Sequence, residues 1–375
     1  MSSKAHDNKV KTIFTYKKIY QAYLDCRTNK RKTINALKFE YELENNLASL
    51  IARLKNRTYT PDRSTCFVVT DPTVREIFAA DFKDRIIHHL FVTELSSITE
   101  KSFCFDSYAC RKGKGTHAAV DRLKKFLPKV TNNYTRQAYC LQLDISSFFM
   151  SIDHNILFGL VKNRINKSTR ENLWKNEMLW LTKVIIYTKA TDNYILKGEK
   201  RNFALLPKGK SLFEVGKFKG LPIGNLTSQF FANLYMNELD QYIKRSLKCR
   251  FYIRYVDDLI ILGNLKSDLE KAIVEIDKFL KQELRLSLNY KKTKLKNIHQ
   301  GIDFLGYYIK PNYVLTRKKV VKRFWSKIRL IQSTKPVDKN RLRELAASYF
   351  GHFGHANSYF LRKKFEQVIE QIVKI

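Results

Sequence analysis

Paired cysteines and long apolar runs are missing from the sequence, and each absence excludes a class of protein. None of the six cysteines is part of a CxxC pair, which argues against a zinc ribbon or a disulfide framework and favours reduced core thiols. No apolar run reaches the roughly 18 residues that a membrane-spanning helix needs, and residues 1–14 lack the apolar segment of a signal peptide. We therefore expect a cytoplasmic protein with no membrane span. The cysteines are Cys26, Cys66, Cys104, Cys110, Cys140 and Cys249.

Acidic residues are scarce relative to basic ones. The chain has 70 Lys and Arg against 35 Asp and Glu, which gives a formal net charge of +35. A globular protein tolerates such a bias best when its partner is a polyanion, so nucleic acid is the first expectation. A ribosome-associated or membrane-surface protein is the alternative. With 375 residues, of which 44% are hydrophobic, the chain can build a substantial core and is not disordered.

The spacing of apolar residues predicts helices and short strands in an irregular order. Helices are expected over 13–57, 81–97, 154–188, 226–247 and 266–283 and in the basic tail from 318. Strands are expected over 66–70, 74–78 and 141–149, a strand pair is expected over 251–262, and two short strands are expected within 286–309. Because strands and helices do not alternate regularly, an α+β fold is favoured over a doubly wound sheet.

Three carboxylates interrupt or close apolar strands. Asp257 and Asp258 lie within the run FYIRYVDDLIIL, and Asp144 follows the apolar residues of LQLDISSFF. Burying unpaired carboxylates is costly, and neighbouring carboxylates disfavour each other's ionisation, so a counter-charge is expected. Two Mg²⁺ ions would supply it, and such a pair supports in-line phosphoryl transfer. The alternative is that Asp257 and Asp258 are ordinary hairpin-turn residues, since Asp is common in turns.

The sequence around these acids resembles reverse transcriptases over nearly the whole chain. The tetrad YVDD at 255–258 is similar to their motif C, and Asp144 with the phenylalanines shortly after it is similar to motif A. The resemblance implies a right-hand polymerase with an antiparallel palm sheet and a helical thumb, acting as an RNA-directed DNA polymerase. It makes Asp144 and Asp257 the principal ligands of two Mg²⁺ ions. Asp258 then completes the acidic cluster, and the carbonyl of Ile145 supplies a further ligand.

The implied reaction is attack of a primer 3′-hydroxyl on the α-phosphate of an incoming dNTP. Phe149 falls where the family keeps its steric gate, a ring that collides with a ribose 2′-hydroxyl; a core aromatic is the alternative. Arg75, in VREIFAADFKDRIIHHL, resembles the residue that meets the triphosphate, and Arg111, in SYACRKGKGTHAAV, resembles one that grips substrate or template. Arg suits such bidentate phosphate contacts, although on so basic a chain either residue could be a solvated surface charge.

Two later motifs extend the resemblance. Lys292 in LNYKKTKL is similar to the motif D lysine that protonates the pyrophosphate leaving group, and the adjacent Lys291 is an alternative. The segment FLGYYI is similar to the primer grip, a hairpin that presses on the 3′ end of the primer. Phe304, Leu305 and Gly306 are therefore expected to contact the primer.

The segment GLPIGNLTSQFFANLYMNELD, at 220–240, indicates the type of reverse transcriptase. Retroviral and group II intron enzymes usually carry Gln where this chain has Ile223, and Ser-Pro where it has Ser228 and Gln229. The present combination is similar to reverse transcriptases of diversity-generating retroelements, and it implies that Ile223, Gly224 and Gln229 lie beside the nascent pair. Ile223 stands in place of an amide and so removes a hydrogen-bonding group. Enzymes of this family misincorporate nucleotides opposite template adenines. A core aliphatic is the alternative role for Ile223.

The implied partners are template RNA, primer or cDNA, and dNTPs, together with a structured non-coding RNA and a small accessory protein. Related bacterial enzymes with similar GLPIGNLTSQ segments act in antiphage defence. A group II intron-like enzyme is a further alternative, and an RNA-binding scaffold without catalysis is the alternative outside enzymes. The chain departs from the family pattern in a longer N-terminal part and a Lys-rich insert near 193–218.

The resemblance divides the chain into an N-terminal helical extension, fingers, palm and basic thumb. The expected parts are 1–60, 61–140 with the start of the palm, 141–310 with a fingers insert at about 155–225, and 311–375. If Z thumb residues contact phosphates, binding should weaken with salt at a log–log slope of about −0.7Z to −0.9Z. His352 and His355 have no cysteine or second histidine pair nearby, so packing or RNA contact is expected rather than a metal site.

Overall fold

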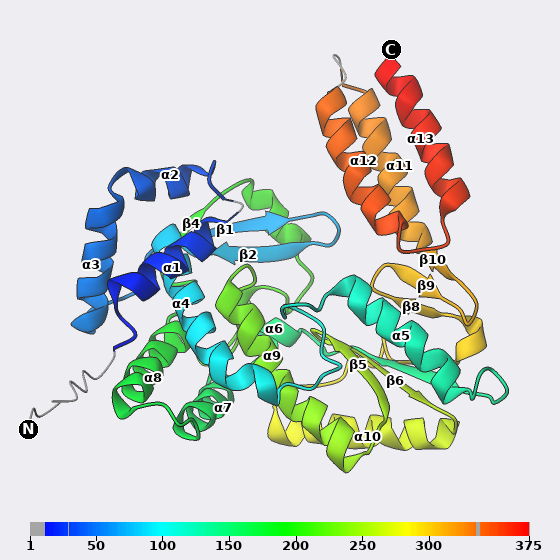
Figure 1. Ribbon diagram of the computed structural model, residues 1–375, viewed down its shortest axis with the longest axis horizontal. Helices are drawn as coiled ribbons and strands as arrows, with labels where there is room; N and C mark the ends of the chain where they lie inside the picture. The colour runs from blue at the N-terminus through cyan, green and yellow to red at the C-terminus, as the bar shows by residue number, and fades with distance from the viewer. Residues whose placement is uncertain (1–11, 29, 335–337, 375) are drawn as a thin grey trace, which may run out of the picture. The chain divides into compact units, whose positions relative to one another are not determined.

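The protein consists of two compact units, each made from segments that are distant in the sequence. The computed structural model describes residues 12–28, 30–334 and 338–374 (Figure 1). Unit 1 contains the described residues up to 105 together with 145–242 and 276–288. Unit 2 contains residues 106–144 and 243–275 and the described residues from 289 onward. The predicted boundaries of fingers, palm and thumb remain predictions.

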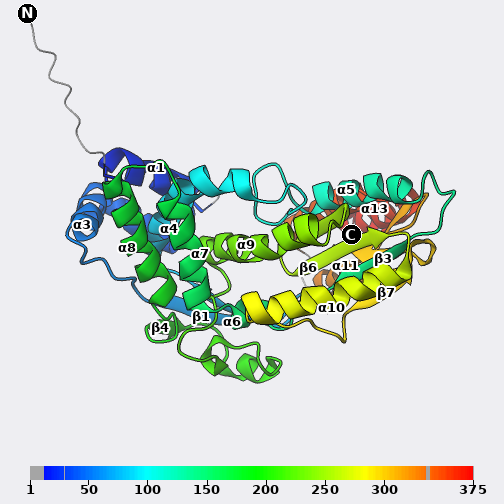
Figure 2. The ribbon, with the colours of Figure 1, turned by 90° about the horizontal axis from the view of Figure 1, so that it is seen from below.

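Unit 1 is built mainly of helices around α9 (Leu226–Gln241). Twelve of its 16 residues are buried, so α9 is a central helix and not an amphipathic surface helix. Helices α4 (Phe82–Thr99) and α7 (His154–Asn166) pack against it, and α8 (Asn172–Tyr187) packs on α7 (Figure 2). The N-terminal helices are α1 (Tyr16–Arg27), α2 (Ile34–Tyr41) and α3 (Leu43–Lys55), and α1 packs on α4.

A small sheet in unit 1 has the strand order β2-β1-β4. Strands β1 (Ser64–Val69) and β2 (Arg75–Ala79) are antiparallel, with Cys66 opposite Phe78, whereas β4 (Tyr194–Leu196) runs parallel to β1. Cys66 and Phe78 form a buried apolar cluster with Met150 and Leu212. The remaining short helices of this unit are η1 (Glu100–Ser102), α6 (Phe148–Ser151), η2 (Lys200–Leu205) and η3 (Leu212–Glu214).

Unit 2 contains a four-stranded antiparallel sheet in the order β5-β6-β3-β7. Its strands are β3 (Tyr139–Leu143), β5 (Phe251–Tyr255), β6 (Asp258–Gly263) and β7 (Lys294–Asn297). The pairing of β3 with β6 ends at Leu143 opposite Leu259, so the residues just beyond this pair are Asp144 and Asp258. Helix α5 (Thr116–Val130) packs on the sheet, and α10 (Lys266–Glu283) contains residues of both units.

A second sheet and a helical bundle complete unit 2. Strands β8 (Ile302–Phe304), β9 (Tyr307–Ile309) and β10 (Val314–Thr316) are antiparallel and share a core with α5. Helices α11 (Lys318–Gln332), α12 (Lys339–Phe353) and α13 (Tyr359–Lys374) form a bundle around Phe324, Phe353 and Phe365 (Figure 1). The π-helix Tyr242–Ser246 and η5 (Ile298–Gln300) are the other short elements. Among the described residues, no helix has both the length and the apolar composition that crossing a membrane requires.

The structure confirms the α+β class and corrects the sequence prediction at two places. The helix expected over 266–283 has these bounds. The strand expected over 141–149 is wrong beyond residue 143, because Ser147 has a φ of 44° and residues 148–151 form the helical turn α6. The region 286–309 holds three strands and not two, and β10 follows them. Strands of three or four residues are too short to leave a clear alternating pattern in the sequence.

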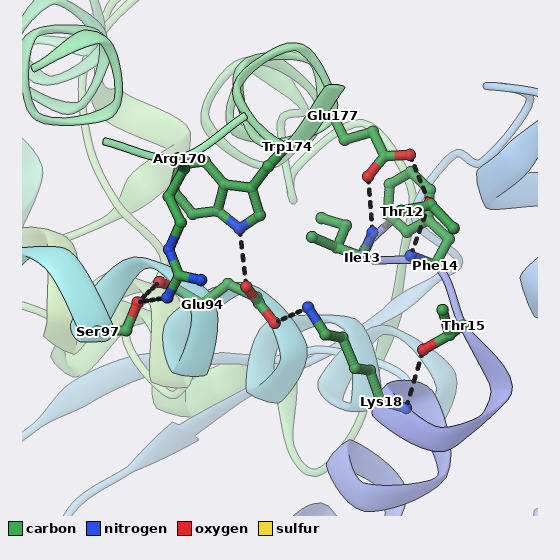
Figure 3. A network of polar contacts seen from close by, with 10 residues as sticks. All are labelled: Thr12, Ile13, Phe14, Thr15, Lys18, Glu94, Ser97, Arg170, Trp174 and Glu177. Atoms are coloured by element: carbon green, nitrogen blue, oxygen red, sulfur yellow. Dashed lines mark hydrogen bonds and ion pairs between the residues drawn. The ribbon is translucent and has the colours of Figure 1, made fainter. Parts of the chain in front are cut away.

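Polar contacts fasten the N-terminal segment to the helices of unit 1 (Figure 3). The buried carboxylate of Glu177, on α8, accepts hydrogen bonds from Thr12 Oγ1 at 2.5 Å and from the Ile13 N–H at 2.8 Å. Glu94, on α4, accepts the indole N–H of Trp174 at 2.8 Å and pairs with Lys18 Nζ at 2.7 Å. The two acids therefore tie the start of the described chain and α1 to α4 and α8.

We expect Glu177→Gln to lower the free energy of unfolding by about 1–3 kcal/mol, because the amide offers one acceptor in place of two, so either the Ile13 N–H or the Thr12 hydroxyl loses its acceptor. Urea denaturation followed by far-UV circular dichroism measures this change. Glu171→Gln, at an exposed position just before α8, is the matched control and should change stability by less than about 0.5 kcal/mol. Equal stabilities of the two variants would contradict the anchoring role of Glu177.

Candidate active site

Asp144 directly follows β3 and is held by the turn that precedes β7. Its Oδ1 accepts a hydrogen bond from Asn289 Nδ2 at 3.0 Å, and its Oδ2 pairs with Lys292 Nζ at 2.8 Å. The backbone makes the same connection, since the Asn289 N–H donates to the Asp144 carbonyl at 2.8 Å. Burial lowers the pKa of Lys292, but its hydrogen bond to Asp144 and the charges of Asp257 and Asp258 outweigh this effect and raise the pKa above its ordinary value. The residues predicted from motifs A and D therefore meet.

Asp257 lies in the tight turn between β5 and β6. Tyr255 pairs with Asp258, which leaves Val256 and Asp257 as a two-residue loop. Val256 has a φ of 57°, a left-handed conformation that is strained for a β-branched residue. Arg254, only 1% exposed, donates from Nη1 to the Val256 carbonyl at 3.0 Å and so braces the turn from the core. The hairpin-turn geometry and the acidic cluster thus occur together at this site.

The pKa of the Asp258 carboxyl group indicates that negative charge is in excess at this site. The residue as a whole is exposed, yet protein atoms surround its carboxyl group. Burial, followed by the charges of Asp257 and Asp144, raises the pKa of Asp258 to about 7, although Lys292 and Arg317 act in the opposite direction. Cationic groups would be attracted to this cluster, because any added positive charge relieves the repulsion among the acids.

A pocket of about 260 Å³ within unit 2 brings predicted site residues together. Asp144, Asp258 and Lys292 line it, as do Phe304 and Leu305 from the predicted primer grip. The turn Leu305–Gly306 joins β8 to β9, and both of its residues have positive φ, 49° and 91°. A Cβ at Gly306 would lie 3.0 Å from a ring carbon of His352, so a larger residue would crowd the turn. Segments that are far apart in sequence thus share one pocket.

Unit 1 brings together a second group of predicted residues. Phe149 and Ile223 are half-buried and pack on the same apolar cluster, which includes Phe78. The Ile223 carbonyl accepts a hydrogen bond from the Phe78 N–H at 2.9 Å, and the Phe149 carbonyl accepts one from the Leu221 N–H at 2.8 Å. Gly224 has a φ of +120°, and a Cβ there would lie 2.9 Å from a side-chain carbon of the adjacent strand β2. The backbone here therefore requires glycine.

The other predicted residues lie outside these two groups. Arg75 is exposed at the start of β2, and Gln229 is exposed on the first turn of α9. Ile145 is buried immediately after Asp144 in the sequence. Arg111, in unit 2, donates from Nη1 to the Ser107 carbonyl at 3.0 Å and does not line the pocket.

The structure adds residues that sequence reasoning missed. Asn289 orients Asp144, and Arg254 braces the turn that carries Asp257. Arg317 and Asp303 line the pocket and form an ion pair. Asn289 lies just before the predicted Lys292, and Arg317 belongs to the quoted segment LTRKK, but neither position has a residue type that would indicate a site by itself.

The donor chemistry of the acidic cluster suits Mg²⁺. Among the described residues, no three His, Cys, Asp or Glu side chains are already arranged around a common metal position. Asp144, Asp257 and Asp258 nevertheless offer the carboxylate oxygens that Mg²⁺ prefers, and their mutual repulsion is of the kind that a divalent cation relieves. These are the residues that would hold the ion. Lys292 already contacts Asp144 Oδ2, so Oδ2 would share its lone pairs between this ammonium and any bound cation.

His352 and His355 take part in ring packing. The His352 ring stacks on Tyr307 with centroids 4.3 Å apart, and the Tyr307 hydroxyl lies 3.1 Å from His352 Nδ1. His355 stacks on His117 with centroids 3.5 Å apart. Face-to-face stacking does not direct the ring nitrogens to a common point, so this geometry favours packing over metal binding.

Comparisons with known proteins add sequence relatives. The Escherichia coli (strain K12) protein YkfC is 24% identical over 283 residues, which cover 66% of each protein. The group II intron-encoded protein LtrA of Lactococcus lactis subsp. cremoris is 21% identical over 360 residues, which cover 78% of this chain and 54% of LtrA. The chain therefore spans less than two thirds of the length of these curated relatives.

A solved structure has a similar fold, and a family profile matches most of the sequence. Apo telomerase from Candida tropicalis superposes with a TM-score of 0.50 and 13% identity, over 84% of this chain and 62% of the telomerase chain. The likeness confirms the expected right-hand polymerase fold. The sequence profile of the family described as "Reverse transcriptase (RNA-dependent DNA polymerase)" matches residues 70–309, more than half of the 375 residues. The chain therefore belongs to the reverse transcriptase family.

Proposed function

We propose that the protein is an RNA-directed DNA polymerase that makes cDNA from a structured RNA template by two-metal nucleotidyl transfer. The observation that carries the proposal is the pocket of unit 2, where Asp144 and Asp258 from neighbouring strands meet Lys292. Asp257 acts on the same group, since its charge raises the pKa of Asp258. Membership of the reverse transcriptase family supports this reading of the acids.

The predicted site residues have separate roles in the proposed reaction. Bound Mg²⁺ would stabilise the attacking primer 3′-oxygen and the leaving pyrophosphate. Asp144, Asp257 and Asp258 would hold the ions, and the strained turn at Val256 carries Asp257. Asp144, Asp257 and Asp258 favour the protonated form of Lys292, so its Nζ carries the proton that this proposal transfers to the pyrophosphate. The turn after Phe304 supports the primer end.

Phe149 selects the sugar in this proposal. Its ring is half-buried on the apolar cluster of unit 1, which limits its movement and suits a fixed steric barrier. Arg75 and Arg111 would contact the triphosphate or the template through their guanidinium groups. Gly224 allows close approach to β2 and keeps the backbone beside Ile223 in place.

We infer further that the enzyme belongs to a diversity-generating retroelement, copies adenines with errors and works with a small accessory protein. The support is the combination of Ile223 with Ser228 and Gln229 in the segment around α9. A group II intron-like function is the second candidate, because LtrA, an intron-encoded protein, aligns with 78% of the chain. A role in antiphage defence is the remaining candidate. Sequencing the cDNA that copurifies with the protein distinguishes them: adenine-specific changes support diversification, and faithful copies of an intron contradict it.

Asp257→Asn should reduce primer extension on RNA by about 100-fold or more, because it removes a negative charge that the reaction requires. Removal of Mg²⁺ with EDTA should abolish extension by the wild-type protein, and added Mg²⁺ should restore it. Asp268→Asn, an exposed position on α10, is the matched control and should extend like wild type. Full activity of Asp257→Asn would refute the proposed chemistry and favour an RNA-binding scaffold.

Phe149→Ala should increase the incorporation of ribonucleotides relative to deoxyribonucleotides by about tenfold or more, because the ring no longer blocks the 2′-hydroxyl. The measurement is the ratio of kcat/KM for dNTP and NTP on one primed RNA. Phe360→Ala removes an exposed ring on α13 and should leave this ratio unchanged. If Phe149→Ala polymerises with the wild-type ratio, Phe149 is a core aromatic and not a gate.

Ile223→Gln should lower misincorporation opposite template adenines several-fold, because it restores an amide beside the nascent pair. Deep sequencing of cDNA made from a defined RNA gives the error rate at each template base. Ile195→Gln, at an exposed position of β4, is the control for the same chemical change. An unchanged error spectrum in Ile223→Gln would assign Ile223 a packing role only.

A further inference from the structure

Arg317 occupies the junction between the three-stranded sheet of unit 2 and helix α11. It follows β10, and its carbonyl accepts a hydrogen bond from the Val320 N–H at 2.8 Å in the first turn of α11. Its own N–H donates to the Gly306 carbonyl at 2.9 Å. The backbone of Arg317 is thus fixed to the turn at 305–306 and to the helix at the same time.

Arg317 is one of the residues that line the acidic pocket. It shares this pocket with Asp144 and Asp258. Its partner in the structure is Asp303 on β8, with which its Nη2 forms an ion pair. A positive group therefore lies beside the acids on the side of β8 and β9.

The ion pair between Arg317 and Asp303 is partly open to solvent. The two side chains are 38% and 42% exposed, although the contacting oxygen, Asp303 Oδ1, is buried, and pairs with such overall exposure contribute only about 0–1 kcal/mol to stability. Asp303 is held in place by another contact, because its carbonyl accepts a hydrogen bond from Gln142 Nε2 on β3 at 2.9 Å. Arg317 Nε is buried and makes no hydrogen bond within the described part of the protein, so a phosphate that replaced the Asp303 carboxylate could bind the planar guanidinium fork through two N–H groups.

From this arrangement we infer that Arg317 binds the terminal phosphodiester of the primer strand and so positions the primer 3′-hydroxyl at the acids. The inference rests on the proposed function, which places the primer end at Leu305 and Gly306. Arg317 is hydrogen-bonded to that turn, whereas Lys292 is the cation next to Asp144. The incoming triphosphate is the other possible anion. Arg317 is a positioning residue in this account, and Asp303 holds its side chain until the primer arrives.

The test measures two quantities for each variant, which are the affinity for a primed RNA template and the apparent KM for dNTP. Fluorescence anisotropy at several KCl concentrations gives the dissociation constant and its salt slope, and single-turnover extension gives the apparent KM for dNTP. Arg317→Gln should weaken duplex binding about tenfold and reduce the salt slope by about 0.7–0.9, with the KM for dNTP within about twofold of wild type. Arg317→Lys, which keeps the charge without the fork, should retain the slope and recover part of the affinity.

Asp303→Asn separates a phosphate contact from a structural ion pair. It frees the guanidinium, so duplex binding should stay equal or tighten, and the double variant with Arg317→Gln should remain as weak as Arg317→Gln alone. Recovery of binding in the double variant would show a purely structural pair and overturn the inference. Unchanged duplex binding with a raised KM for dNTP in Arg317→Gln would also overturn it and assign the triphosphate to Arg317.

Control experiments distinguish a failure of this inference from a failure of the proposed function. Lys310→Gln removes a charge at the opposite end of the β9–β10 hairpin, outside the pocket, and should behave like wild type. Thermal melting of Arg317→Gln and Arg317→Lys confirms that both are folded. If the wild-type protein binds the duplex but extends no primer, the proposed function fails. If wild type extends the primer and Arg317→Gln binds the duplex equally well with the same slope, only the role of Arg317 fails.

Discussion

Repulsion among three carboxylates is the constraint on which the structure of unit 2 depends. Asp144 and Asp258 come from neighbouring antiparallel strands, and Asp257 lies in the turn before Asp258. Carboxylates brought together in this way disfavour each other's ionisation, so the fold has to provide compensating charge. Lys292 supplies it by a direct contact with Asp144, and Arg317, which lies between β10 and α11, acts on Asp258. The core of the sheet must then be stable enough to hold these groups together.

The elements around the acids can be understood as supports for this cluster. The side chain and the backbone of Asn289 both bond to Asp144, so the acid is held at two points. Buried Arg254 holds the turn at Val256, and Gln142 connects β3 to β8. Unit 1 has a different organisation, in which the helices surround the buried α9 and the small sheet packs on an apolar cluster. Charge interactions dominate the acidic pocket of unit 2, and apolar packing dominates the cluster around Phe149 and Ile223 in unit 1.

Local patterns predicted those features that depend on local sequence. The bounds of α10 and the hairpin of β5 and β6 follow from periodicity and from a short turn between apolar runs. The three acids stand out in the sequence because carboxylates are unusual at the ends of apolar strands. The turn at Ser147, the short β10 and the contact of Asn289 with Asp144 depend on tertiary structure. No spacing in the sequence specifies such contacts, because they form between segments that meet only in the folded chain.

The backbone at Val256 has a consequence for engineering. Glycine or asparagine adopts a positive φ with less strain than valine, so laboratory selection for heat resistance should favour these residues at position 256. The same replacement would give the loop beneath Asp257 more conformational freedom and a less defined direction for its carboxylate. Thermal stability and a defined placement of Asp257 would then be in competition at a single residue, and a thermostable variant of this protein is better sought by changes elsewhere in the chain.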